Sequence, residues 1–267
     1  MTEKITSAKN PKIKELIRLC RSRNRKRSDK VVVEGSREIF MALESGFDAA
    51  SLFICTDLVS GEDMKRLGSL IPPETELIEI SRHVFESAAY RGGSDGLILL
   101  AHPIRRSLND LKIKKDALVV ALETVEKPGN LGAIARTAEA AGCDAILICN
   151  PLTDIYNPNT IRSSLGCIFS VPAVACTNEE ALQWLHERKI PVFSTYIDPE
   201  ARSLYKTDLN GPAAIVLGSE AEGISPFWIE NSDQRIVVPM QGKVNSMNVS
   251  ATAAIIIFEA LRQRTSE

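Results

Sequence analysis

The sequence is short of the residues from which metal sites and disulfide frameworks are built. It has six cysteines and three histidines in 267 residues, and no two cysteines form a Cys-x-x-Cys pair. Structural zinc sites need tighter ligand clusters, so we expect no metal and six reduced thiols. The scarcity of histidine also argues against most hydrolases that use histidine for acid-base catalysis.

Long apolar runs are missing as well. The longest run near the end, residues 253–258, is far shorter than the roughly 18 residues that span a bilayer. The opening Met-Thr-Glu-Lys lacks the hydrophobic stretch of a secretory signal. With 44% hydrophobic and 25% charged residues, the composition predicts a folded cytoplasmic protein without a membrane partner.

Charge is distributed unevenly along the chain. Residues 1–30 contain eleven lysines and arginines but only three acids, whereas the whole chain has a net charge of −2. A basic segment on an otherwise acidic chain favours contact with a polyanion, most simply a nucleic acid. The alternative is a helix whose charges only face solvent.

The first hundred residues have the pattern of a basic helix followed by a small α/β domain. Asn10-Pro11 opens a helical pattern with Ile13, Leu16 and Ile17 on one side. We expect strands at 31–33, 52–55, 77–80 and 96–101, and helices at 37–44, 63–70 and 81–90. Alternation of strands and helices is typical of an α/β fold.

The remainder predicts a second, larger α/β domain. Continuous apolar strands are expected at 117–122, 145–149, 192–194 and 213–217, with helices at 132–141, 178–188 and 249–264. Such strands are typical of a parallel sheet covered on both faces. The expected division is a basic extension (1–30), an N-terminal α/β domain (31–103), a linker (104–115) and a mostly parallel α/β domain (116–267).

The first of three notable segments in the second domain is residues 123–142. A Pro-Gly turn precedes a helix rich in glycine and alanine, with Asn130 as its expected N-cap and Arg136 within it. An arginine among closely packed small residues is unusual, although an exposed arginine on an ordinary helix explains it too.

The second segment, residues 215–226, is an apolar strand that leads into an acidic loop. Gly218 and Gly223 flank this loop, which contains Glu220. Ligands of open α/β sheets bind beyond the carboxyl ends of strands, and glycines let the backbone approach them closely. The loop lacks the glycine pattern and the lysine of phosphate-binding loops. A tight turn without a ligand is the alternative.

The third segment, residues 236–254, is a short strand that ends at Pro239, a polar loop and a helix from about Asn248. Ser246 and Asn248 are good N-cap residues, so capping alone is the alternative to a role in binding.

In this order and spacing, the three segments resemble the motifs of the SpoU/TrmH family of RNA ribose 2′-O-methyltransferases, within the SPOUT superfamily. The family pattern runs Asn-x-Gly-x-x-x-Arg-x-Ala, then Gly-x-Glu-x-x-Gly, then Pro-Met and later Ser-Leu-Asn-Val-Ser. The one departure is Met247 in place of leucine, a swap that conserves volume. The resemblance is strong over 117–264. Residues 30–101 resemble, more weakly, the substrate-binding domain of the ribosomal-RNA branch.

The resemblance implies a trefoil knot in the C-terminal domain, a homodimer with composite active sites, S-adenosylmethionine as cofactor and RNA as partner. The residues expected at the cofactor, largely through backbone groups, are Thr195, Leu217, Gly218, Gly223, Val238, Met240 and Met247. The residues expected to take part in catalysis are Arg136, Asn130, Glu220, Ser246 and Asn248. The residues expected to contact RNA are Arg162, Arg21, Arg23, Arg25, Lys26 and Arg27.

In the mechanism that the resemblance implies, Arg136 activates the ribose 2′-hydroxyl. A guanidinium stays protonated, so we expect it to stabilise the developing alkoxide while the proton leaves to a phosphate or to water. Asn130 would brace Arg136, and Glu220 would fix Arg136 or its own loop. Ser246 and Asn248 would order the cofactor loop.

Large-subunit ribosomal RNA is the expected substrate, because family members restricted to transfer RNA tend to lack a full N-terminal α/β domain. Three alternatives stay open: a transfer-RNA 2′-O-methyltransferase, an inactive RNA-binding protein on the same fold, and an enzyme that methylates a base.

Overall fold

The computed structural model describes residues 4–25, 28–90, 95–219, 222–244 and 246–265, except for the side chains of Ser22 and Arg23. The chain forms two compact units. The first comprises the chain up to Ile104 together with Tyr156–Ser170, and the second comprises Arg105–Ile155 and Val171–Glu267. The segment 156–170 thus leaves the second unit between two of its strands and packs with the first.

The first unit is built on a four-stranded mixed sheet of order β1-β4-β2-β3. Its strands are β1 (Val31–Glu34), β2 (Asp48–Ile54), β3 (Glu76–Glu79) and β4 (Leu97–His102). Its helices are α1 (Pro11–Leu19), α2 (Ser22–Arg25), α3 (Ser36–Glu44), α4 (Gly61–Leu70), α5 (Arg82–Ala88), α7 (Pro158–Ser163) and α8 (Cys167–Ser170). Strand β4 pairs antiparallel with β1 and β2, whereas β2 and β3 are parallel.

The basic helix α1 is part of this unit's core. Asn10 caps it by accepting a hydrogen bond from the Lys12 amide at 2.9 Å. Ile13, Leu16 and Leu19 are completely buried and join the apolar cluster of the sheet and α5. One side of α1 is therefore core, and the basic residues lie on its other sides.

The second unit holds a seven-stranded sheet of order β7-β6-β5-β10-β8-β11-β9, and each neighbouring pair of these strands is parallel. Its strands are β5 (Leu118–Glu123), β6 (Ala145–Cys149), β7 (Ala173–Cys176), β8 (Val192–Thr195), β9 (Arg202–Ser203), β10 (Ala213–Leu217) and β11 (Gln234–Val237). The predicted parallel sheet is confirmed. The sequence pattern missed β7, α7 and α8, which are short.

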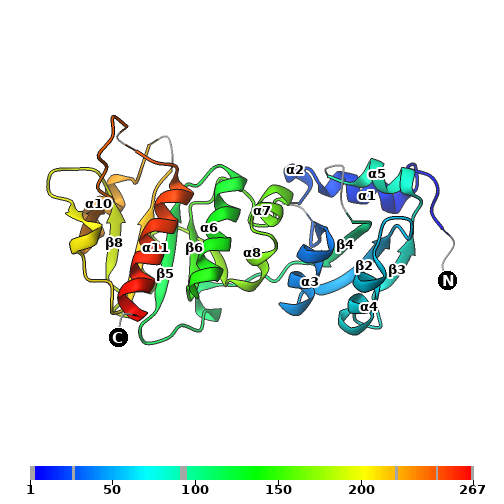
Figure 1. Cartoon of the computed structure of the whole chain (residues 1–267), viewed down its shortest axis with the longest axis horizontal. Helices are drawn as coiled ribbons and strands as arrows, with labels where there is room; N and C mark the ends of the chain where they lie inside the picture. The colour runs from blue at the N-terminus through cyan, green and yellow to red at the C-terminus, as the bar shows by residue number, and fades with distance from the viewer. Residues whose placement is uncertain (1–3, 26–27, 91–94, 220–221, 245, 266–267) are drawn as a thin grey trace. The chain divides into compact units, whose positions relative to one another are not determined.

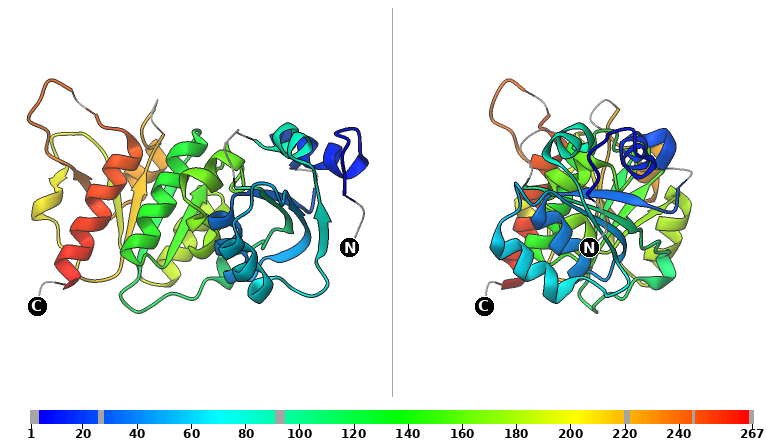
Figure 2. Two further views of the ribbon diagram at one scale, coloured as in Figure 1. Left: turned by 45° about the vertical axis from the view of Figure 1, so that its right-hand side comes forward. Right: turned by 90° about the vertical axis from the view of Figure 1, so that its right-hand side faces the viewer.

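Helices cover both faces of this sheet. They are α6 (Pro128–Ala141), α9 (Asn178–Glu187), α10 (Pro226–Asn231) and α11 (Val249–Thr265), with two 3-10 turns, η1 (Leu108–Asp110) and η2 (Leu204–Lys206). Helices α6 and α11 lie side by side on one face (Figure 1, Figure 2). Because strand side chains alternate, Val119 and Ala121 of β5 face the other side, where they share a core with Trp184 of α9 and Trp228 of α10.

Candidate cofactor cavity

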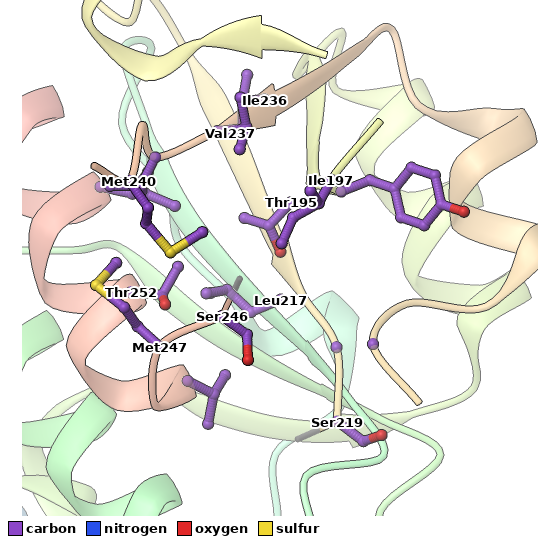
Figure 3. Close-up of a pocket in the computed structure, with 16 residues that line it drawn as sticks. Thr195, Ile197, Leu217, Ser219, Ile236, Val237, Met240, Ser246, Met247 and Thr252 are labelled. Carbon is purple, nitrogen blue, oxygen red and sulfur yellow. The ribbon is translucent and has the colours of Figure 1, made fainter. Parts of the chain in front are cut away.

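A cavity of about 320 Å³ lies at the carboxyl ends of β8, β10 and β11, closed by the start of α11 (Figure 3). All seven residues predicted to hold a cofactor line it, together with Ser246. They come from four separate stretches of the chain, namely 195–197, 217–223, 236–240 and 246–256. This location fits the rule that ligands of parallel sheets bind beyond the carboxyl ends of strands.

The glycine positions are explained by close backbone packing at the end of β10. Ser219 and Gly223 exchange backbone hydrogen bonds of 2.9 and 3.1 Å, which draw the two ends of the loop together. A Cβ at Gly218 would lie 2.1 Å from the carbonyl carbon and oxygen of Gly223, and Gly223 itself has a φ of +70°. Only glycine fits at Gly218 without opening the loop.

The cavity wall carries no carboxylate, lysine or arginine among the described lining residues. Aliphatic and methionine side chains alternate with backbone groups at glycine and with hydroxyls such as that of Thr195, which donates a 3.0 Å hydrogen bond to the Val216 carbonyl. Such a wall suits a ligand with a flat uncharged ring held through the backbone. A cationic ligand would also meet no repelling charge there.

Motif reasoning missed part of the wall. Tyr196 and Ile197 follow β8, and Thr252 and Ile256 lie on α11. Arg235 of β11 holds the loop after β8 through hydrogen bonds to Asp198 at 2.8 Å and to Glu200 at 2.5 Å. The apolar lining residues belong to ordinary strand and helix patterns, so the sequence has no local signal that sets them apart.

Asn130 and Asn248 connect the first motif to the third. The Asn248 amide donates to the Asn130 Oδ1 at 3.2 Å, and the Asn248 Oδ1 accepts the Ser250 amide at 2.9 Å. Asn248 therefore caps α11 and also contacts α6. The expectation that Asn130 is the N-cap of α6 is wrong: the helix begins at Pro128, because proline suits the first helical position.

Arg136 lies on α6 at an exposed position and is not a lining residue of the cavity. Within the described part of the chain, no carboxylate or carbonyl pairs with its guanidinium. Glu220, predicted to fix Arg136 or the second motif, lies outside the described residues. The structure thus joins Asn130 to Asn248, places Ser246 in the cavity wall and leaves Arg136 exposed outside that wall.

Of the residues predicted to contact RNA, Arg162 on α7 and Arg21 are exposed. The prediction for Arg25 is wrong. Its side chain is 5% exposed and donates to the carbonyls of Leu19 and Cys20 at 3.0 and 2.7 Å, so it caps the end of α1. Lys26 and Arg27 lie outside the described residues, as does the side chain of Arg23.

Across the described ranges, no three histidine, cysteine or acidic side chains gather as a metal site. No helix in these ranges is long and apolar enough to cross a membrane. The six cysteines, all within the described ranges, form no disulfide bond.

A parallel sheet with a cavity at the carboxyl ends of its strands is typical of α/β domains that bind a ligand, and comparison with known proteins specifies the class of this one. The model of the SpoU rRNA Methylase family matches residues 117–258, and that of the MRM3-like substrate binding domain matches residues 10–99. The chain belongs to the SpoU rRNA methylase family.

Proteins of similar length share both units. The chain is 27% identical to the 23S rRNA (uridine(2479)-2′-O)-methyltransferase of Streptomyces viridochromogenes, over 98% of this chain and 93% of that protein. A crystal structure of an RNA 2′-O ribose methyltransferase is 36% identical, with a TM-score of 0.85 over 98% of this chain and 99% of that one. The methyltransferase AviRb from Streptomyces viridochromogenes, solved with its cofactor AdoMet, is 25% identical with a TM-score of 0.87, over 97% of this chain and 99% of that one.

Proposed function

We propose that this protein transfers a methyl group from S-adenosylmethionine to a ribose 2′-hydroxyl of 23S ribosomal RNA. The observation that carries the proposal is the cavity, because six predicted residues of the second and third motifs meet in its wall together with Thr195. The 23S assignment is supported by the full-length similarity to the Streptomyces viridochromogenes enzyme, which includes the N-terminal unit. An RNA-binding protein without activity would not need this cavity.

S-adenosylmethionine fits the residues present. Its adenine ring suits the aliphatic wall, and its hydrogen-bonding edges suit backbone groups at Gly218 and Val238. Its sulfonium cation meets no lysine or arginine among the described lining residues. When bound, it supplies the electrophilic methyl group. The cavity is at the lower end of the 300–1,000 Å³ typical of ligand sites.

Residues of the protein must then hold the RNA ribose and activate its 2′-hydroxyl. Arg136 stabilises the charge that develops on the 2′-oxygen, while the proton passes to a phosphate or to water. Asn130 and Asn248 fix α6 against the start of α11 through their 3.2 Å hydrogen bond. Ser246 and Glu220 complete the proposed set of catalytic residues, of which Glu220 is not among the described residues.

A homodimer explains why Arg136 is exposed and does not line the cavity of its own chain: it serves the cavity of a second copy. Helix α11 supports this, since Ile255 to Phe258 are four consecutive apolar residues and so point around the whole helix. Phe258 is 47% exposed on a helix beside α6. A second copy docked on α6 and α11 would cover this apolar surface.

Phe258→Glu is expected to convert a dimer into a monomer and to abolish methylation, because a buried unpaired charge would oppose docking. Light scattering after size-exclusion chromatography measures the mass, and label transfer from S-adenosylmethionine measures activity. Leu77→Glu on β3 is the matched control, since Leu77 is also 47% exposed. It should stay dimeric. A Phe258→Glu protein that remains dimeric and active would contradict the proposed interface.

We propose that the N-terminal unit binds the RNA. Among the described residues, the exposed side chains of Arg21 and Arg162 are the proposed contacts. The proposed functional division remains a basic extension, an RNA-binding domain, a linker and a methyltransferase domain. Because Ile13, Leu16 and Leu19 of α1 share the apolar core of the N-terminal unit, we assign the basic extension to the same RNA-binding part. A cytoplasmic location and a trefoil knot in the second unit belong to the same proposal.

The test is incubation of the full chain with labelled S-adenosylmethionine and either 23S ribosomal RNA or transfer RNA. Label is expected in 23S RNA alone. Label in transfer RNA alone would support the alternative substrate, and no label in either would favour an RNA-binding protein.

A further inference from the structure

Glu123, the last residue of β5, is a buried carboxylate that the proposed mechanism leaves without a role. It is 3% exposed and accepts three hydrogen bonds. The Ser225 amide donates to Oε2 at 2.7 Å, the Ser225 hydroxyl to Oε1 at 2.6 Å, and the Asn178 side-chain amide to Oε1 at 2.6 Å. All three distances are short for protein hydrogen bonds.

The three donors belong to two segments of the second unit: the end of the loop that follows β10, and the start of α9. Ser225 ends the loop that begins at Gly218, and it precedes Pro226, the first residue of α10. Asn178 is the first residue of α9, and Thr177 alone separates it from the end of β7. The Oδ1 of Asn178 accepts no hydrogen bond from any described residue, so the recorded polar contact of this buried side chain is with Glu123.

Glu123 does not touch the cavity. It has the same parity along β5 as Val119 and Ala121, which face α9 and α10, whereas the cavity borders α11. The Glu123 side chain therefore contacts the end of the loop from the α9 and α10 side of the sheet, opposite the cavity. The loop is fixed at two places: by the Ser219–Gly223 backbone bonds beside the cavity, and by Ser225 on Glu123.

We propose that Glu123 is a positioning residue for the cofactor, which holds Ser225 and thereby sets the backbone of Gly218 and Gly223 at the cavity wall. This inference rests on the proposed S-adenosylmethionine site. A glutamine at position 123 would keep the volume but offer only one acceptor oxygen, and its NH₂ group would face a donor. At least one of the three donors would then lose its partner, and the loop would shift away from its binding geometry.

Glu123→Gln in the full-length protein is expected to raise the Kd for S-adenosylmethionine about tenfold, measured by calorimetry. The turnover number at saturating S-adenosylmethionine should stay within about twofold of wild type, because no group that contacts the RNA ribose is changed. Ser225→Ala, a milder variant that keeps the backbone donor, should raise the Kd about threefold. In the double variant the two effects should not multiply, since both act through one contact.

Asp144→Asn is the matched control for a purely structural role. Asp144 accepts the backbone amides of Lys114 and Leu118 at 3.2 and 3.0 Å, at the opposite end of β5. It should lower the melting temperature and leave the Kd unchanged.

Two results would overturn the inference, and each points to a different error. If Gly218→Ala abolishes S-adenosylmethionine binding while Glu123→Gln and Ser225→Ala bind as wild type, Glu123 is only structural. If the wild-type protein does not bind S-adenosylmethionine, or Gly218→Ala binds it normally, the proposed site itself is wrong and the inference falls with it.

Discussion

Replacing Arg136 with alanine is expected to lower the methylation rate at least about a hundredfold, because a preorganised charge that stabilises a developing oxyanion contributes several kcal/mol to the transition state. Arg136 is exposed and has no partner among the described residues, so its removal leaves no buried group unpaired. Binding of S-adenosylmethionine, the melting temperature and the dimer mass should all remain at wild-type values. Single-turnover label transfer measures the effect.

Lysine at position 136 is the informative second variant. It keeps the positive charge but loses the planar fork of the guanidinium, so it should recover little activity. Turnover of Arg136→Ala within tenfold of wild type would remove Arg136 from the mechanism.

Gly218→Ala is expected to abolish measurable binding of S-adenosylmethionine. The new Cβ would lie 2.1 Å from backbone atoms of Gly223, and backbone cannot move aside as a flexible side chain can, so the Ser219–Gly223 bonds must break. Gly211→Ala, before the same strand, is the control, since nothing lies within 4 Å of its Cβ. Calorimetry should show control binding as in wild type. Binding by Gly218→Ala within threefold of wild type would place the cofactor elsewhere.

Together these two variants test the proposed homodimer, in which each active site combines the cavity of one subunit with Arg136 of the other. In a mixed dimer of Arg136→Ala and Gly218→Ala subunits, one site combines the intact cavity of the first with the intact arginine of the second. Co-purified mixed dimers should therefore regain about half of the wild-type activity, although each homodimer is inactive. If Arg136 acts on its own subunit's cavity, the mixed dimer stays inactive.

The parallel sheet could be predicted because its strands are buried on both faces and read as continuous apolar runs, such as β5 and β10. The cavity residues could be predicted because their motifs lie where strands end, and Gly218 needs the absence of a side chain. The sequence alone could not predict which distant residue each polar side chain contacts in the folded protein. Glu123 directly follows the predicted strand 117–122, but its partner Ser225 lies 102 residues away in the sequence.

The basic segment shows the same limit. Charge alone grouped Arg25 with the exposed arginines, because composition does not distinguish a guanidinium that caps α1 from one that faces water. Likewise, residues 156–170 follow β6 in sequence but pack with the N-terminal unit, through contacts of the α7–α8 segment with α3 and β1. Local patterns determine elements, whereas long-range packing determines the unit to which they belong.

The position of the transferred methyl group tests the central claim most directly. Full-length protein, S-adenosylmethionine and 23S ribosomal RNA are incubated, the RNA is digested to nucleosides, and the methylated product is identified by mass spectrometry. The account predicts one 2′-O-methylated nucleoside, with the added mass on the ribose fragment, and none with Arg136→Ala. A methyl group on the base fragment, or undiminished product from Arg136→Ala, would contradict it.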